Sequence, residues 1–141
     1  MTDLDIFKIE ARKVRKWAIR KDKYQRPGLW GWCTTCSVKL FKILKEKGYK
    51  PIFSLAYRNS TYSNAHCFIL CNDYIIDVTA TQFDNEDKAI NIFKVGKNRK
   101  CRRWYWNYNN CDKFENMADI AKAMSDFPED QNPFMIINNL Y

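Results

Sequence analysis

The spacing of hydrophobic residues changes from a helical period to a strand period at Gly48, and this change constrains the fold most. Before Gly48, apolar residues recur at helical spacing over residues 3–20 and again over Cys33–Lys47. After Gly48, short runs rich in β-branched and aromatic residues alternate with turn signals. Two helices followed by neighbouring strands predict an α+β fold, with a helix packed on an antiparallel β-sheet.

The second part of the chain supplies the predicted strands and one more helix. Residues 65–71 and 74–79 flank the pair Asn72-Asp73, which predicts a β-hairpin with a two-residue turn. The other predicted elements are strands over residues 50–58, 89–95 and 101–108, a helix over residues 111–127 that Pro128 ends, and a docked C-terminal segment over residues 133–141.

Length and composition predict one domain over residues 1–141. The chain is 46% hydrophobic and 16% aromatic, which is enough to build a core in 141 residues. No apolar run approaches the length of a membrane span, so we expect no membrane partner. The first residues, MTDLDIFKIEARK, lack the apolar segment of a secretory signal, which predicts a cytoplasmic location.

The six cysteines have two interpretations. An even number fits a disulfide framework in a secreted chain, whereas thiols stay reduced in the cytoplasm. Because no secretory signal is recognised, we expect reduced thiols. The cysteines are Cys33, Cys36, Cys67, Cys71, Cys101 and Cys111.

The net charge of +8 is concentrated in two segments, Arg12–Arg26 and Lys94–Trp106. Both segments interleave basic with aromatic residues, a composition typical of surfaces that bind nucleic acid. An acidic protein partner and a merely solvated basic face fit the same composition. The sequence leaves these three interpretations open.

Cys33 opens the second predicted helix and is a candidate nucleophile. The unpaired N–H groups and the dipole at a helix N-terminus stabilise an anion, which lowers the pKa of a thiol there. The same N–H groups can later stabilise an oxyanion. A cysteine at this position can also be an ordinary core residue, so further residues must decide.

His66, the only histidine of the chain, has an expected partner in Asp77. A two-residue turn at Asn72-Asp73 pairs Cys71 with Tyr74. This register makes His66 and Asp77 diagonal neighbours on one face of the hairpin. A slip of one residue would separate them. Asp77 also lies in an apolar context, YIIDVTA, where an ionisable side chain needs a partner.

These three residues fit the roles of nucleophile, base and orienting acid. Cys33 would attack an amide or acyl carbon. His66 would take the thiol proton and return it to the leaving amine. Asp77 would fix the imidazole tautomer and stabilise its charged form.

At this point the sequence resembles the transglutaminase-like branch of the papain-like cysteine enzymes, over about residues 28–83. Gly31-Trp32-Cys33 matches the family's Gly-x-Cys at a helix start, with Gly48 fifteen residues after Cys33. His66 and Asp77 match the other triad members by order and context. The segment Asp77–Phe83 also resembles papain-fold toxins and phage-type homologues.

The resemblance implies a papain-like fold and a Cys33 thioester formed from a protein or peptide substrate, with no cofactor and no metal. It also selects Cys33 over Cys36 as the nucleophile. Peptide hydrolysis, glutamine deamidation and amine transfer are all compatible with it. The alternative is a non-catalytic basic module that binds nucleic acid or an acidic protein.

The donors of the oxyanion hole are less clear in the sequence. The family's upstream glutamine has no match at its usual spacing, and Gln25, eight residues before Cys33, is the nearest candidate. The backbone N–H of Cys33 and an indole N–H of Trp30 or Trp32 are the alternatives. These tryptophans either line an acyl-binding cleft or pack the loop.

Two other interpretations of Cys33-x-x-Cys36 compete with catalysis. The spacing fits half of a zinc site, completed by other cysteines. It also fits a thioredoxin-like redox pair, which would require a preceding strand. The helical context of Cys36 favours a small core residue instead, and so do the strand positions of Cys67 and Cys71.

Overall fold

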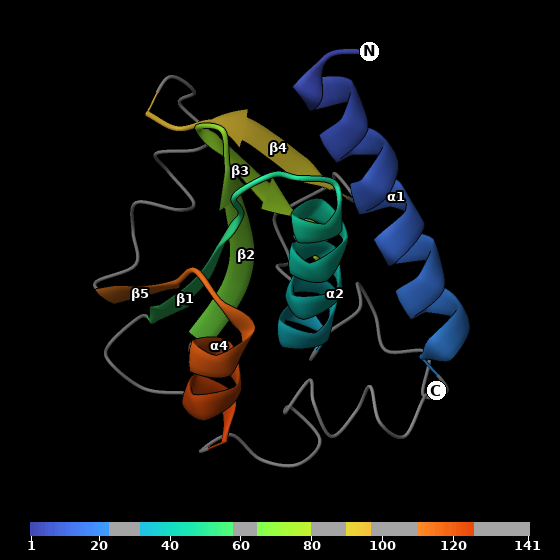
Figure 1. Cartoon of the computed structure of the whole chain (residues 1–141). Helices are drawn as coiled ribbons and strands as arrows, with labels where there is room; N and C mark the ends of the chain where they lie inside the picture. The colour runs from blue at the N-terminus through green and yellow to red at the C-terminus, as the bar shows by residue number, and fades with distance from the viewer. Residues whose placement is uncertain (23–31, 58–64, 80–89, 97–109, 126–141) are drawn as a thin grey trace.

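The structure is a computed structural model, and it describes residues 1–22, 32–57, 65–79, 90–96 and 110–125. In these residues the chain forms an α+β fold, as predicted, with helices beside one antiparallel sheet (Figure 1). The elements are α1 (Asp3–Lys21), α2 (Cys33–Glu46), β1 (Ile52–Tyr57), β2 (Ala65–Cys71), β3 (Tyr74–Asp77), β4 (Asn91–Lys94), β5 (Asn110–Phe114) and α4 (Met117–Met124).

The sheet has the strand order β4-β3-β2-β1-β5, and every neighbouring pair is antiparallel. Helices α1 and α2 pack against each other on one side of it (Figure 1). Helix α2 lies over β2 and β1, and α1 reaches β3. The start of α2 is therefore held close to the two strands of the predicted hairpin.

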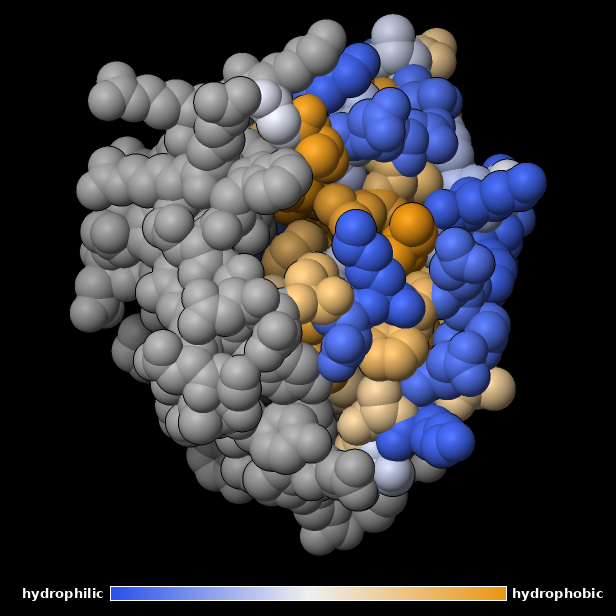
Figure 2. Space-filling view, turned by 90° about the vertical axis from the view of Figure 1, so that its left-hand side faces the viewer, coloured by the Kyte–Doolittle hydropathy of each residue, from blue (hydrophilic) through white to orange (hydrophobic). Residues whose placement is uncertain are grey.

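The main core fills the space between the helices and the sheet. Its largest buried side chains are Phe7, Phe41, Phe53, Leu40, Leu44, Leu55, Ile69 and Ile76. Ala56, Phe68, Ile75 and Phe93 form a second, smaller cluster. Figure 2 views the molecule from the left-hand side of Figure 1, and hydrophobic residues gather in the middle of the described surface there, next to hydrophilic ones.

The hairpin between β2 and β3 has the predicted two-residue turn. Asn72 and Asp73 have φ angles of 48° and 65°, the left-handed values that a type I′ turn requires. Cys71 pairs with Tyr74, and the ladder continues to Ile69 and Ile76. The predicted register is thus confirmed over this part of the hairpin.

The prediction of one helix over residues 111–127 was wrong in its first part. Residues Asn110–Phe114 form β5, which pairs with β1 and sets Phe114 opposite Phe53. The helix begins only after Asn116, whose side-chain Oδ1 accepts a hydrogen bond of 2.9 Å from the Asp119 N–H. The predicted strand at 101–108, Pro128 and the segment 133–141 lie outside the described residues.

Helix α1 begins with a capping box that can be tested directly. The Asp5 N–H donates to Thr2 Oγ1 and the Thr2 N–H donates to Asp5 Oδ2, both at 3.1 Å. We expect Thr2→Ala to lower the free energy of unfolding by about 1 kcal/mol, measured by urea titration. Lys8→Ala, on the exposed side of α1, should change it by less than about 0.5 kcal/mol. Equal effects of the two substitutions would contradict a stabilising role for the cap.

None of the described helices combines the length and the hydropathy that crossing a membrane requires.

Candidate active site

Three separate elements bring Cys33, His66 and Asp77 together. Cys33 is the first residue of α2, His66 lies near the start of β2, and Asp77 ends β3. His66 Nε2 and Asp77 Oδ2 are 2.7 Å apart, and both side chains are 1% exposed. Cys33 is partly exposed, and it lies close enough to the His66 ring for each to shift the pKa of the other through a hydrogen bond. A cysteine, a histidine and a carboxylate therefore meet at one site.

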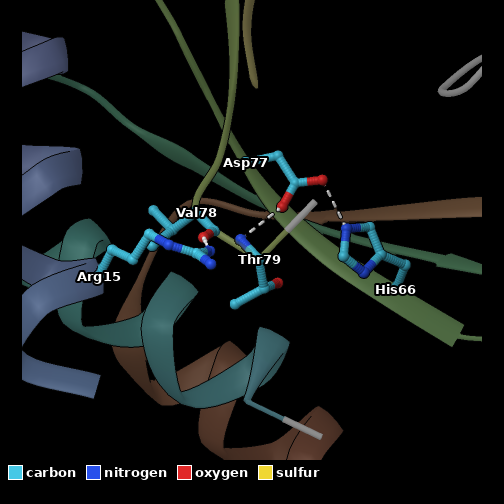
Figure 3. A network of polar contacts seen from close by, with 5 residues as sticks. All are labelled: Arg15, His66, Asp77, Val78 and Thr79. Carbon is cyan, nitrogen blue, oxygen red and sulfur yellow. Dashed lines mark hydrogen bonds and ion pairs between the residues drawn. The ribbon is translucent and has the colours of Figure 1, made fainter. Parts of the chain in front are cut away.

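The contacts of Asp77 fix the tautomer of His66. A carboxylate only accepts hydrogen bonds, so Nε2 of His66 must carry a proton and donate to Oδ2. That leaves Nδ1 as the ring nitrogen that can exchange a proton with Cys33. The second oxygen, Asp77 Oδ1, accepts a hydrogen bond of 3.0 Å from the Thr79 N–H (Figure 3). Asp77 is thus held from two sides.

Arg15 supports this arrangement from α1 and was not singled out in the sequence. Its Nη1 donates to the Val78 carbonyl at 2.8 Å, directly after Asp77 in the chain (Figure 3). Burial lowers the pKa of Arg15, and the nearby Cys36 and Asp77 oppose that effect. Arg15 lies four residues after the buried Ala11, so helical spacing was the available signal for its inward position. The sequence interpretation had assigned it to the basic segment.

The pKa of the Cys33 thiol is lowered well below 9.0. The largest cause is a hydrogen bond from the Cys67 thiol to the Cys33 thiolate; burial opposes it, and the hydrogen bond and charge of His66 lower the pKa further. Burial alone would also lower the pKa of His66. The charge and hydrogen bond of Asp77, helped by Cys33, instead raise that pKa to about 10. The two shifts together favour a pair made of a thiolate and an imidazolium.

The two cysteines of the Cys33-x-x-Cys36 motif differ in their environments. Cys36 is buried in the core below α2, and burial together with the neighbouring Cys33 raises the pKa of its thiol. Cys67 and Cys71 also lie in this core, as predicted, and burial raises the pKa of each, that of Cys71 to about 11. Cys33 is the cysteine in this group that is suited to act as a nucleophile.

Of the remaining two cysteines, the structure describes only Cys111. Cys111 is exposed on β5, and Cys101 lies outside the described residues. All five described cysteines are free thiols. In the described part of the chain, no group of three or more histidine, cysteine or acidic residues could hold a metal ion.

Trp32 is placed in the core. Its ring meets Trp17 of α1 edge-on, with ring centroids 5.8 Å apart. Its indole Nε1 is buried and has no hydrogen-bond acceptor among the described residues. This placement favours packing of the loop over a role in an acyl-binding cleft. Gln25 and Trp30 lie outside the described residues.

The backbone N–H of Cys33 is the oxyanion donor that the described structure leaves available. The N–H groups in the first turn of a helix have no acceptor within the helix. In α2 the first such hydrogen bond runs from the Cys36 N–H to the Trp32 carbonyl at 2.9 Å, and no side-chain hydrogen bond from Trp32 caps the helix. The start of α2 can therefore place N–H groups and the nucleophile at the same reacting carbon.

The basic segments are only partly described. In the first segment, Arg12, Lys13, Lys16, Arg20 and Lys21 are exposed on α1. Most of the second segment lies outside the described residues. The exposed part of α1 therefore carries a basic surface on the side away from the core.

Comparison of the chain with protein-family models, curated proteins and solved structures finds no match.

Proposed function

We propose that this protein is a papain-like cysteine enzyme of the transglutaminase-like type, which transfers the acyl group of an amide through a thioester on Cys33. The observation that carries the proposal is the buried His66–Asp77 pair in contact with a cysteine at a helix N-terminus. Such a triad is defined by its geometry and its roles rather than by its fold. The α+β architecture, with the cysteine helix beside the sheet, is compatible with the family that the sequence resembles.

The reaction would begin with attack of the Cys33 thiolate on the carbonyl carbon of the bound amide. The developing oxyanion would be stabilised by N–H groups at the start of α2. The His66 imidazolium would give its Nδ1 proton to the leaving amine, and the amine would depart to leave a thioester. Neutral His66 would then take a proton from water or from a second amine, which attacks the thioester and regenerates the thiolate.

The second nucleophile decides which reaction this is. Water gives hydrolysis of a peptide bond or deamidation of a glutamine, and an amine gives transfer. The proposed substrate is a protein or peptide, and the basic surface of α1 favours an acidic one. We favour a modifier of one particular partner over a general protease. A mass increase of about one dalton on a partner glutamine would indicate deamidation, and cleavage of the partner would rule that reaction out.

Alkylation kinetics test the triad without knowledge of the substrate. Native protein is treated with limiting iodoacetamide between about pH 4 and pH 9, and labelled cysteines are mapped by mass spectrometry. We expect Cys33 to react fastest below neutral pH, because its pKa is lowered whereas the pKa values of the other described cysteines are raised. His66→Ala should shift the Cys33 profile to higher pH, since it removes the hydrogen bond and the positive charge of the ring.

The internal controls are Cys36 and Cys111. Burial raises the pKa of the Cys36 thiol, and partial desolvation of its thiol raises that of Cys111 although the residue is exposed. Both should remain largely unlabelled at acidic pH in the wild type and in His66→Ala. If Cys33 reacts no faster than these two residues, the thiolate–imidazolium pair does not exist and the catalytic proposal fails.

The second candidate function is a non-catalytic module that binds nucleic acid or an acidic protein. The exposed basic residues of α1 are the observation in its favour. It predicts binding that weakens steeply with salt and that Cys33→Ala does not change. Cys33→Ala that abolishes turnover and leaves binding intact would instead indicate an enzyme whose basic surface recruits its substrate.

A further inference from the structure

Cys67 follows the candidate base His66 in β2, yet it points to the opposite face of the sheet. There it belongs to the core beneath α2, and Cys33 packs against the same core. The two side chains lie close enough for each to shift the pKa of the other through a hydrogen bond. The candidate nucleophile therefore touches the base on one side and a second cysteine on the other.

We propose that Cys33 and Cys67 are a redox modification site, at which a hydroperoxide converts the candidate nucleophile into a reversible disulfide with Cys67. The inference goes beyond acyl transfer and needs only a reactive Cys33 beside Cys67. Formation of the disulfide would block the nucleophile and also protect it from irreversible oxidation.

The chemistry balances in two steps. In the first, the Cys33 thiolate attacks one peroxide oxygen, the O–O bond breaks, and an alkoxide or hydroxide leaves and takes up a proton. Sulfur loses two electrons to the peroxide and becomes a sulfenic acid. In the second, the Cys67 sulfur attacks the Cys33 sulfur, the S–O bond breaks, and hydroxide leaves as water with the Cys67 proton. Two thiols and one hydroperoxide thus give a disulfide, an alcohol or water, and one further water.

The environment of Cys67 changes in favour of the second step once the first has occurred. Burial is the main cause that raises the pKa of Cys67, and the hydrogen bond to the Cys33 thiolate and its negative charge add to it. A sulfenic acid is neutral, so these two contributions vanish when Cys33 is oxidised. Cys67 therefore becomes easier to ionise when its partner has become the electrophile.

The spacing in the sequence suggests a different pairing, between Cys33 and Cys36. Both residues belong to α2, and Cys36 lies in the core below the helix. The charge of Cys33 helps to raise the pKa of Cys36, whereas the pKa of Cys33 is lowered by Cys67 and His66. A hydrogen bond connects Cys33 to Cys67 instead. Cys67 and Cys36 are therefore the two candidates for the cysteine that forms a disulfide with oxidised Cys33. Substituting each of them in turn gives a matched pair of variants.

The test treats reduced, full-length protein with hydrogen peroxide and then maps all cysteines by peptide mass spectrometry without reduction. We expect a loss of two hydrogen masses and a crosslinked peptide pair that contains Cys33 and Cys67. Dithiothreitol should restore both thiols. In Cys67→Ala, the Cys33 peptide should instead gain the two or three oxygens of sulfinic or sulfonic acid, and dithiothreitol should not reverse this.

Cys36→Ala is the matched control, because it also removes one buried thiol near Cys33 and should still form the crosslink. A Cys33–Cys36 crosslink in the wild type, or overoxidation of Cys33 without any crosslink, would overturn the proposal. Mapping of the wild type suffices for this decision even if a variant does not fold. Failure of the acyl-transfer proposal has a separate signature, namely a disulfide that forms at a site with no substrate turnover.

Discussion

Asp77→Asn is expected to slow alkylation of Cys33 at about pH 6 by about 100-fold, to the rate of an ordinary thiol, which is mostly protonated at that pH. Turnover of an amide substrate should fall further, by about 10⁴-fold, the effect of a wrong histidine tautomer in another triad. The substitution changes one oxygen to an NH₂ group and leaves the side chain the same size. The expected loss is therefore chemical and not a consequence of packing.

The reason lies in the hydrogen bond from the Thr79 N–H to Asp77 Oδ1. In the variant, the amide oxygen must keep accepting this bond, because a flipped amide would set its NH₂ group against the Thr79 N–H. The NH₂ group then faces His66 Nε2 and donates to it. The ring proton is driven to Nδ1, so neutral His66 cannot accept the proton of Cys33.

Asp112→Asn, the same change at an exposed position on β5, is the control and should leave the alkylation profile of Cys33 unchanged. The urea unfolding curve of Asp77→Asn shows whether the variant is folded under the conditions of the assay. A folded Asp77→Asn that is alkylated at the wild-type rate would show that Asp77 does not set the protonation of His66.

The second large effect concerns how stability depends on pH. In the folded protein the pKa of His66 rises from 6.5 to about 10 and that of Cys33 falls well below 9.0, so the proton of the pair is favoured on His66. Between pH 6.5 and 9.0 the unfolded chain also holds one proton, but on Cys33. The two states bind equal numbers of protons wherever Cys33 is ionised, so stability from this pair stays level.

Below pH 6.5 and above pH 9.0, the folded and unfolded states no longer bind equal numbers of protons. At lower pH the unfolded chain binds the second proton, so stability falls as the pH falls. Above 9.0 the unfolded chain has lost its cysteine proton while His66 keeps its own until about 10, so stability falls as the pH rises. The contribution of the pair should therefore be greatest between the two ordinary pKa values.

Cys33→Ala removes the cysteine proton that the unfolded chain holds, so this proton no longer offsets the one that the folded protein holds on His66. The raised pKa of His66 persists through Asp77, so the variant should lose stability as soon as the pH rises above 6.5. The difference in unfolding free energy between the wild type and Cys33→Ala should grow by up to about 1.4 kcal/mol per pH unit, measured by urea titration at several pH values. Between pH 6.5 and 9.0, Cys36→Ala should give a curve parallel to that of the wild type, because the Cys36 thiol is protonated in both states there. A parallel curve for Cys33→Ala over the same interval would contradict the ion pair.

Elements with local signals were predictable from the sequence. The start of α2 at Cys33, the turn at Asn72-Asp73 and the pairing of Cys71 with Tyr74 depend on residues close together in the chain. Because the turn at Asn72-Asp73 sets the register of the hairpin, counting residues from this turn was enough to predict that His66 and Asp77 are neighbours. The change from helical to strand spacing of the hydrophobic residues at Gly48 predicted the α+β fold class.

The rest depends on contacts between distant segments. Residues 110–114 look helical in isolation and become a strand because β1 offers them an edge, with Leu55 opposite Asp112. The inward position of Arg15 depends on where α1 meets the end of β3. The hydrogen bond from Cys67 to Cys33 depends on where α2 lies across the sheet, which no local pattern specifies.

The hydrogen bond from Arg15 to the Val78 carbonyl joins residues 63 positions apart, with Cys33 and His66 between them in the sequence. During synthesis on the ribosome, Cys33 therefore emerges well before the strand that ends at Asp77. Until that strand emerges, no carboxylate can hold His66 charged, and Cys33 has the reactivity of an ordinary thiol. Under the proposed mechanism, a nascent chain would thus reach the end of β3 before Cys33 could react with a substrate.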